Sequence, residues 1–394
     1  MKNFLYIADT CSQKKYIEYV ESRGARTSQQ AQKYNLLLAE GLANCGSRVR
    51  IISTRPMNRN LSKKLWFKTE KERENGVAFH YLSFINHPAL RKFCLVFGTF
   101  FHILFSREKK RETVVICDAL NIAATVGALA ASSLRGYKTI GIVTDVPCHL
   151  SDMKNIPFSQ KLNLSIMKKF KGYLLLTEPM KDLVNPKKRP YIVLEGHADR
   201  AMEHVSNTAE EKNSTRICLY AGSLKRIYGI ESLVKGFVSA NLPNAELHVY
   251  GNGDYVEDLK TLSKQYSAVQ YKGIAPNADI VEAELRATLL VNPRPTNEEY
   301  TKYSFPSKNM EYMASGTPVL TTRLPGMPKD HEPYVFFIED ETAEGITAAL
   351  KEIFSLPQEE LHAFGLRAKE FILKEKNNIA QAEKVVLFAD ELAK

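Results

Sequence analysis

The sequence predicts an α/β protein made of two doubly wound domains that face each other across a cleft. Three observations carry this prediction. Apolar, strand-like runs alternate with amphipathic helical stretches along nearly the whole chain, which is typical of parallel sheets covered by helices on both faces. The chain has 394 residues, more than one hydrophobic core usually supports. The alternation also stops at one polar segment and then restarts, so we expect two domains.

The first predicted domain spans residues 1–199. Its strands are short apolar runs, and its helices place apolar residues at helical spacing, as Leu38 and Leu42 do. The expected strands are 4–8, 49–53, 77–84, 114–118, 139–145 and 172–177, and the expected helices are 28–45, 91–111, 121–134 and 158–170. Continuous apolar strands of this kind predict a parallel sheet that is buried on both faces.

The second predicted domain spans residues 200–375. The stretch 203–215 holds no apolar cluster and indicates an interdomain linker. The strand pattern then restarts, and a C-terminal helix near 376–394 is expected to pack back on the first domain. The expected strands are 216–222, 246–251, 269–273, 289–293 and 318–322, and the expected helices are 229–240, 254–266, 278–287 and 307–315. Ligands of doubly wound sheets bind beyond the carboxyl ends of the strands, so the cleft between the domains is the predicted site.

The composition excludes several classes of protein. The six cysteines lie far apart with no CxxC pair, so we expect a reducing, cytoplasmic compartment and neither a disulfide framework nor a zinc ribbon. The first apolar run has about five residues, which is too short for the core of a signal peptide. No stretch reaches the roughly 18–20 apolar residues that a membrane span needs. The chain is basic, because 54 Lys and Arg against 44 Asp and Glu give a formal net charge of +10.

Part of this positive charge flanks an aromatic segment. Residues 91–111, RKFCLVFGTFFHILFSREKKR, hold an apolar block between basic residues. Such a helix lies on an anionic membrane surface, on the inner face of the plasma membrane, or packs as a plain core helix that ends in a solvated charge run, and both can hold at once. The chain carries no recognition-helix, zinc-finger or RNP-like signature, so nucleic acid is not an expected partner.

The most informative segment for function is 291–318, VNPRPTNEEYTKYSFPSKNMEYMASGTP. A strand delivers Arg294 to the predicted cleft, and a helix begins near Ser307, since Pro306 suits the first helical turn. The N–H groups of the first helical residues, 307–309, favour an anion. Lys308 and Glu311 lie on one helix face, which suits a nucleoside diphosphate with Lys on phosphate and Glu on ribose. The alternative is a capped surface helix with an exposed ion pair.

Two glycine turns add to this pattern. YAGSLKRIYGI (220–230) follows the first strand of the second domain, and there Gly222 allows a tight turn while Lys225 and Arg226 reach toward a pyrophosphate. VYGNGD (249–254) places Gly251 at the end of the next strand. Each turn alone is weak, because glycines are common at strand ends. Together with the segment at 291–318 they favour a nucleotide-binding domain.

These segments resemble a known family. YAGSLKRIYGIESLVKGF, ELHVYGNGD, VQYKGI and SFPSKNMEYMASGTPVL, in this order, are similar to the nucleotide-binding domain of GT-B glycosyltransferases. The nearest group is the retaining family 4, the group 1 transferases of bacterial polysaccharide and glycolipid biosynthesis, whose two domains are Rossmann-like. The resemblance implies that Glu311, the second glutamate of an E-x7-E motif, holds the donor ribose. It implies that the backbone of Ile274 contacts the base and that Ser307 and Lys308 lie by the diphosphate.

The sequence departs from the family pattern at three positions. Tyr303 stands where the first glutamate of E-x7-E is expected. Ser223 and Tyr228 stand where the family carries a basic pair. Lys225, Arg226, Arg294 or Lys308 can replace that charge, which a departing diphosphate requires because it develops negative charge. We favour Arg294 and Lys308, because they flank the predicted anion site. Tyr303 leaves open a subgroup with altered donor contacts or an inactive relative.

The first domain offers candidates for the acceptor side. The turn 22–35 joins the first strand to its helix, where it either lines the acceptor site or caps the helix. By resemblance, segment 143–150 carries a polar residue near the reacting sugar. Asp118 and Asp145 both end apolar strands at the predicted cleft edge, and Asp145 is the first choice for that role with His149 the second. A strand-end aspartate is as often a helix cap as a catalytic group.

The sequence therefore predicts a cytoplasmic, membrane-associated glycosyltransferase. It would move a sugar from a UDP- or GDP-sugar donor to a lipid-linked glycan or polysaccharide acceptor, with retention implied by the resemblance. No cofactor or metal is expected, since the chain has no DxD triplet, HExxH motif or paired Cys/His spacing. Two alternatives remain: a nucleotide-sugar epimerase of the same architecture, and a non-catalytic partner that binds nucleotide sugar.

Overall fold

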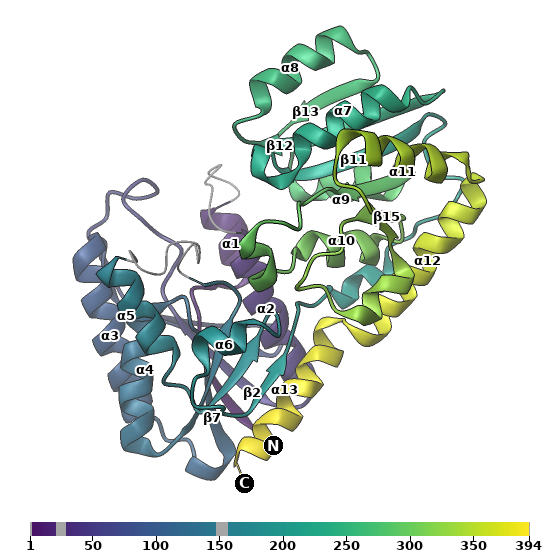
Figure 1. Cartoon of the computed structure of the whole chain (residues 1–394). Helices are drawn as coiled ribbons and strands as arrows, with labels where there is room; N and C mark the ends of the chain where they lie inside the picture. Colours follow the sequence, from purple (N-terminus) through teal and green to yellow (C-terminus); the bar gives the residue numbers. More distant parts are fainter. Residues whose placement is uncertain (1, 21–28, 147–156, 394) are drawn as a thin grey trace. The chain divides into compact units, whose positions relative to one another are not determined.

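A computed structural model describes residues 2–20, 29–146 and 157–393 of the chain (Figure 1). The chain divides into two compact units, each with its own sheet and core. Unit 1 comprises Met1–His197 together with Asn378–Lys394, and unit 2 comprises Ala198–Asn377. The chain therefore passes through unit 2 and returns to unit 1 for its last helix.

Unit 1 is built on a sheet of eight strands in the order β10-β9-β8-β7-β1-β2-β5-β4. All neighbours are parallel except β4, which runs antiparallel to β5 at the edge. The strands are β1 (Asn3–Ile7), β2 (Arg48–Ser53), β4 (Glu70–Glu74), β5 (Val77–Tyr81), β7 (Thr113–Asp118), β8 (Lys138–Val143), β9 (Gly172–Leu175) and β10 (Tyr191–Val193). The apolar strands β1 and β7 are buried along their whole length, as continuous apolar runs predict.

Helices and a small ribbon complete unit 1. The helices are α1 (Gln13–Tyr19), α2 (Gln29–Asn44), α3 (Pro88–Leu104), α4 (Ile122–Arg135), α5 (Phe158–Met167), α6 (Met180–Val184) and α13 (Asn378–Ala393), and the ribbon pairs β3 (Trp66–Phe67) with β6 (Phe84–Ile85). Helix α13 packs on α2, where the Asn378 amide donates to the Leu37 carbonyl over 3.2 Å and the Gln381 amide donates to the Gly196 carbonyl over 2.7 Å. These bonds fix the returning helix to unit 1.

Unit 2 is a six-stranded parallel sheet in the order β13-β12-β11-β14-β15-β16. Its strands are β11 (Arg216–Ser223), β12 (Ala245–Asn252), β13 (Val269–Gly273), β14 (Leu289–Asn292), β15 (Val319–Thr321) and β16 (Phe336–Phe337). Its helices are α7 (Ile230–Ala240), α8 (Val256–Gln265), α9 (Asn277–Arg286), α10 (Ser307–Ser315), α11 (Ala343–Ser355) and α12 (Gln358–Glu375). The strand order reverses between β11 and β14, and ligands bind at such switch points in doubly wound sheets.

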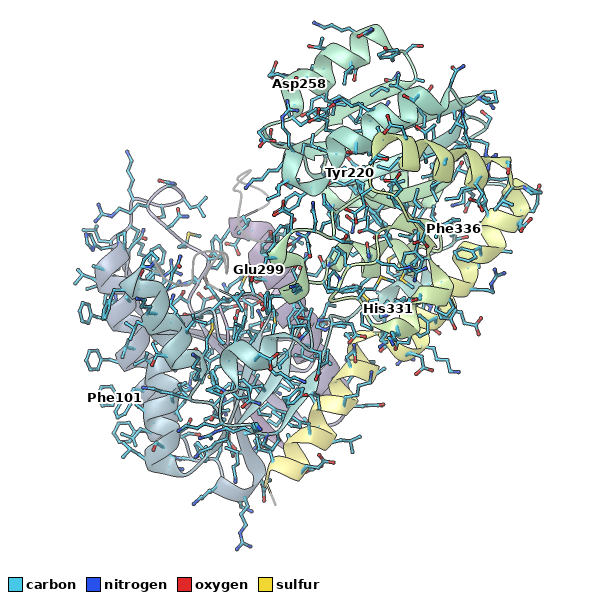
Figure 2. All side chains as sticks on the ribbon, in the orientation of Figure 1. Phe101, Tyr220, Asp258, Glu299, His331 and Phe336 are labelled. Atoms are coloured by element: carbon cyan, nitrogen blue, oxygen red, sulfur yellow. The ribbon has the colours of Figure 1, made fainter. Side chains whose placement is uncertain are left out.

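The aromatic segment 91–111 forms most of α3 and the loop after it. Thr99 and Ile103 are buried, and a Cβ on Gly127 of α4 would lie 2.1 Å from the Val96 carbonyl oxygen, so the two helix backbones touch. The opposite face of α3 is exposed to solvent, and Phe101 points outward from it (Figure 2). The expectation of a plain core helix is therefore wrong for this face. No helix in the described part of the chain is long and apolar enough to cross a membrane.

Candidate active site

Glycines bring the loops after β11 and β12 into backbone contact. A Cβ on Gly251 would lie 1.8 Å from the Gly222 carbonyl oxygen, and Gly251 has a φ of 134°, which L side chains rarely adopt. A Cβ on Gly253 would lie 2.2 Å from the Leu224 carbonyl carbon. The two predicted glycine turns thus form one tightly packed wall at the carboxyl edge of the sheet.

The loops after β11 and β14 meet at the switch point of unit 2. A Cβ on Gly229, which ends the first of these loops, would lie 2.0 Å from the carbonyl oxygen of Pro293, which begins the second. Arg294 follows directly, and α10 starts at Ser307 after the short helix Glu299–Tyr303. The 220–230 and 291–318 segments, far apart in sequence, therefore come together where a doubly wound sheet binds its ligand.

A buried amide network holds the start of α10 in place. The Asn292 amide donates to Asn309 Oδ1 over 2.7 Å, and the Asn309 amide donates to Thr321 Oγ1 over 3.3 Å. Pro306 precedes the helix and has no side-chain oxygen to cap it, and Ser307 is exposed. The Asn309 N–H donates to the Pro306 carbonyl over 3.0 Å, so the prediction that this N–H is available to an anion is wrong. The exposed helix start still presents the positive end of its dipole.

Two cations lie at this edge. A Cβ on Gly222 would lie 2.9 Å from Lys308 Cε, so the Lys308 side chain lies against the β11 turn. The Arg294 guanidinium carbon lies 4.9 Å from the Tyr228 ring centroid and 5.1 Å from that of Tyr300. The structure thus brings Lys308 and Arg294, both selected from the sequence, to the two loops of the switch point.

Tyr228 and Tyr300 are contacts that the sequence analysis did not assign. Their rings lie 6.4 Å apart at 76°, and both flank Arg294, which also donates to Ser304 Oγ over 3.3 Å. Burial raises the pKa of Tyr300, while the nearby Arg294 charge opposes that shift. The sequence shows that Tyr228 stands where the family carries a basic residue. Nothing in the sequence shows that a tyrosine at this position stacks on an arginine 66 residues later.

Arg226 is placed differently from its prediction. Its guanidinium pairs with Glu231 and Asp258, each over 2.6 Å, and lies 4.8 Å from the Tyr255 ring centroid. These contacts hold the Arg226 side chain at the N-terminal ends of α7 and α8. This placement counts against Arg226 as a diphosphate ligand. Lys225 beside it is exposed.

The remaining candidates of unit 2 are spread along the same edge. Ser223 is exposed at the end of β11, and its carbonyl accepts a 2.8 Å hydrogen bond from the Tyr220 hydroxyl. Ile274 is 61% exposed just after β13. Tyr303 closes the short helix before α10, and Glu311 is half-buried one turn inside α10.

In unit 1, the strand-end aspartates occupy different environments. Asp145 follows β8, is exposed, and accepts a 2.7 Å hydrogen bond from the Val146 N–H. His149 lies outside the described residues, as do residues 22–28 of the 22–35 turn. Asp118 ends β7 next to β1, at the point where the strand order of unit 1 reverses.

Asp118 belongs to a buried polar network. Asn35 donates to its carboxylate over 3.2 Å, the Leu120 N–H donates over 3.0 Å, and the Tyr6 hydroxyl donates to Asn35 over 2.9 Å. Burial raises the pKa of Asp118 despite these bonds. The sequence shows both Asp118 and Asp145 at strand ends, and the resemblance favours Asp145, whereas the strand order places Asp118 at the switch point of unit 1.

Comparison with known proteins agrees with these features. Residues 202–371 match the family model described as Glycosyl transferases group 1. A sucrose-phosphate synthase from Thermosynechococcus elongatus has a similar structure, with a TM-score of 0.67 at 15% identity, covering 100% of this chain and 99% of that one. A glycosyltransferase from Rickettsia africae gives a TM-score of 0.68 at 16% identity, covering 100% and 99%.

A third structure is Alr3699/HepE from Anabaena in complex with UDP-glucose, with a TM-score of 0.66 at 11% identity, covering 99% of this chain and 100% of that one. No curated protein matches the chain in sequence. The structural likenesses confirm the predicted fold class, two Rossmann-like α/β domains of the GT-B type. The family match confirms the resemblance seen in the segments from 216 onward.

Proposed function

We propose that this chain, whose residues 202–371 match the family model of the group 1 glycosyl transferases, moves a sugar from a UDP- or GDP-sugar to a lipid-linked glycan or polysaccharide acceptor. The reaction proceeds with retention and without a metal ion, at the cytoplasmic face of a membrane. The observation that carries this proposal is the position of Lys308 against the Gly222 turn at the β11–β14 switch point.

Lys308 and Arg294 supply the charge that the departing diphosphate requires. When the bond between the sugar and the diphosphate breaks, negative charge builds on the phosphate oxygens, and fixed cations beside them lower the barrier. Lys308 is held by α10, and Arg294 is held between Tyr228 and Tyr300, so both are positioned before the donor binds. The start of α10 adds its dipole in the same place.

The other donor contacts follow the resemblance. Glu311 holds the ribose and the backbone at Ile274 contacts the base, while Tyr303 takes the place of a sugar-binding glutamate. Unit 1 binds the acceptor, with Asp145 as the polar residue near the reacting sugar and His149 as the second candidate. Solved relatives support a nucleotide-sugar donor, since the Anabaena protein has been captured with UDP, UDP-glucose, and UDP with glucose.

A screen of nucleotide sugars by thermal shift tests the proposal and identifies the donor. A bound donor raises the melting temperature with its affinity, so one UDP- or GDP-sugar should give the largest shift, and Glu311→Ala should reduce that shift. Transfer from the selected donor is then measured with a lipid-linked acceptor, and product configuration is read by NMR. If no nucleotide sugar shifts the melting temperature, the donor site is not at this edge.

Tyr303 favours one alternative, a non-catalytic partner that binds nucleotide sugar without transferring it. The same assays separate the two functions. A binding protein would show the thermal shift but neither transfer nor slow hydrolysis of the donor, and Tyr303→Glu would be the variant in which to look for recovered activity.

A further inference from the structure

The outward face of α3 is a stripe of exposed phenylalanines. Phe93, Phe97, Phe101 and Phe105 follow each other at intervals of four residues, and their exposed fractions are 62%, 56%, 48% and 74%. The Phe101 and Phe105 rings stack, with centroids 6.0 Å apart. Contiguous exposed aromatics on one helix face mark an interaction surface, because water is a poor solvent for them.

A basic cavity lies beside this stripe. Its volume is about 640 Å³, and Phe101 and Phe105 form part of its wall. Four cations line it, namely Arg50, Lys71, Arg73 and Arg107, together with two carboxylates, Glu72 and Glu108. Both carboxylates already have partners: Glu108 lies 3.1 Å from Arg50, and Glu72 accepts from the Tyr81 hydroxyl. Within the described chain, Lys71, Arg73 and Arg107 form no ion pair, so the cavity carries uncompensated positive charge.

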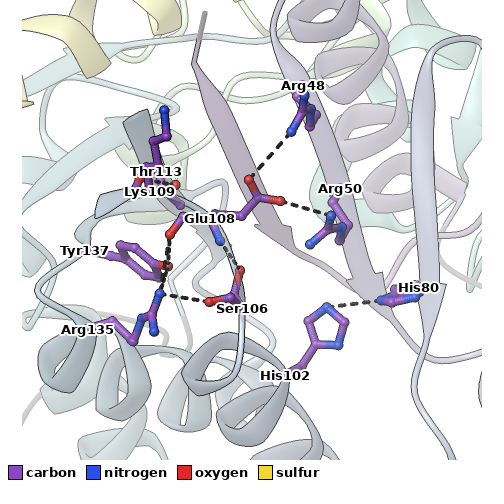
Figure 3. Close-up of polar contacts among 10 residues, drawn as sticks. All are labelled: Arg48, Arg50, His80, His102, Ser106, Glu108, Lys109, Thr113, Arg135 and Tyr137. Atoms are coloured by element: carbon purple, nitrogen blue, oxygen red, sulfur yellow. Dashed lines mark hydrogen bonds and ion pairs between the residues drawn. The ribbon is translucent and has the colours of Figure 1, made fainter. Parts of the chain in front are cut away.

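The loop that closes the cavity is held in place. Figure 3 shows Glu108 bridging Arg48 and Arg50 of β2 while its backbone carbonyl accepts from the Tyr137 hydroxyl over 2.9 Å. Arg135 donates to the Ser106 carbonyl over 2.8 Å. The segment after α3 is thus tied to the sheet and to α4, so the cavity is present before any ligand binds.

A histidine pair forms the boundary between polar and apolar walls. His80 Nδ1 and His102 Nε2 lie 3.1 Å apart, so one ring donates to the other (Figure 3). Burial, together with the nearby charges of Lys71 and Arg50, lowers the pKa of both rings to about 4. The pair is therefore neutral at physiological pH, and the positive charge of the cavity comes from its lysine and arginines.

A second cavity continues along α3 from the first. Its volume is about 370 Å³, and it shares Phe101 and His102 with the basic cavity. Most of its wall is apolar, including Leu82, Cys94 and Phe97. An anion-binding hollow joined to an apolar one matches the two chemistries of a phospholipid, a phosphate headgroup and acyl chains.

We propose that this surface, defined as the Phe93–Phe105 stripe with the two cavities along it, docks the protein on an anionic phospholipid bilayer. A headgroup phosphate enters the basic cavity among Lys71, Arg73 and Arg107. The phenylalanines enter the upper acyl region, and the exposed basic run 107–111 meets neighbouring headgroups. The docking rests on the membrane face named in the proposed function and places it on specific residues. Its test uses no sugar, so its failure and failure of sugar transfer are distinguishable.

The full chain is tested by co-sedimentation with vesicles of phosphatidylcholine alone and of phosphatidylcholine with phosphatidylglycerol at 7:3. Binding is expected to the mixed vesicles and to be much weaker to the neutral ones. The triple variant Lys71→Gln, Arg73→Gln, Arg107→Gln should weaken binding to mixed vesicles on the order of 100-fold, since each surface cation contributes about 1 kcal/mol. The matched control, Lys264→Gln, Lys272→Gln, Lys351→Gln, loses the same charge from exposed positions of unit 2 and should bind as the wild type does.

A second variant tests the aromatic face. Phe97→Ser, Phe101→Ser, Phe105→Ser should abolish sedimentation with mixed vesicles while leaving the melting temperature unchanged, because these side chains are already exposed. Equal losses in the charge variant and its control would overturn the proposal. So would binding that the three phenylalanines do not affect, or a concentration-dependent dimer that they abolish in analytical ultracentrifugation, which would assign the face to a second copy. Binding of inorganic phosphate without vesicle binding would overturn it as well.

Discussion

The switch points of the two sheets differ in the residues that form them and in the sign of their charge. In unit 2, glycines let three loops meet backbone to backbone, and Arg294 and Lys308 stand at the exposed edge. In unit 1, the equivalent position between β1 and β7 is filled by Asp118 and Asn35, which are buried and hydrogen-bonded to each other. The switch point of unit 2 is therefore cationic and closely packed through glycines. The switch point of unit 1 is acidic and is filled by polar side chains.

Under the proposed function, the two edges would bind two different kinds of ligand. A diphosphate needs close backbone approach and positive charge, which glycine turns, a helix start and two cations provide. The hydroxyl groups of a glycan need hydrogen-bonding partners of either polarity rather than charge, which carboxylate and amide groups provide. The comparison therefore supports the proposal that unit 2 binds the donor and unit 1 binds the acceptor.

The largest expected effect comes from closing the glycine contact. Gly251→Ala would place a methyl group 1.8 Å from the Gly222 carbonyl oxygen at a φ of 134°, so strain and overpacking together should lower the free energy of unfolding by about 3–5 kcal/mol. Gly273→Ala is the matched control, because its φ of 76° is also positive but nothing lies within 4 Å. Its cost should be only about 1–2 kcal/mol. Urea unfolding followed by circular dichroism measures both, and equal costs would show that the turns are not packed as described.

The next effect concerns charge at the same edge. Lys308→Met keeps most of the length of the side chain but removes its charge, so kcat for sugar transfer should fall about 10²–10³-fold, the usual effect of losing one fixed group that stabilises transition-state charge. The control is Lys264→Met in α8, an exposed lysine outside the switch point, which should leave kcat unchanged. A Lys308 variant with normal kcat and only a raised KM would mean that Lys308 binds the donor without stabilising the departing diphosphate.

The contrast between the two edges was only partly predictable from the sequence. Apolar runs predicted most strands, because a strand that is buried on both faces needs continuous apolar residues. Glycines at strand ends predicted the turns of unit 2. Strand β4, EKERE, escaped prediction, since its antiparallel edge position leaves charged side chains in solvent. Strand order is a long-range property, so the sequence did not show that Asp118, and not the first choice Asp145, ends the strand at the switch point of unit 1. The contacts of Arg226 with Asp258 likewise depend on how α8 packs.

The smallest expected effect is a difference between the two units in how the free energy of unfolding depends on pH. Lys212 of unit 2 donates to the Leu285 carbonyl over 2.6 Å and to Thr317 Oγ1 over 2.8 Å, and burial lowers its pKa to about 7 from the ordinary 10.5. Between these values the unfolded chain binds more protons than the folded one, so Lys212 makes stability rise with pH, by about 1 kcal/mol per pH unit. Lys212→Met should flatten the slope of unfolding free energy between pH 7 and 9.

Asp118 of unit 1 acts with the opposite sign. Burial raises its folded-state pKa above the ordinary value near 4, so the folded chain binds the extra proton, and the contribution of Asp118 to stability is present below about pH 4 and lost as pH rises through the folded-state value. Asp118→Asn removes the ionisable group, so the variant does not lose stability as pH rises through this range. Relative to wild type, its free energy of unfolding should therefore increase from pH 4 upward, whereas Lys212→Met should lose its relative advantage as pH rises from 7. Parallel pH profiles for the two variants would mean that the two buried groups do not titrate as their surroundings predict.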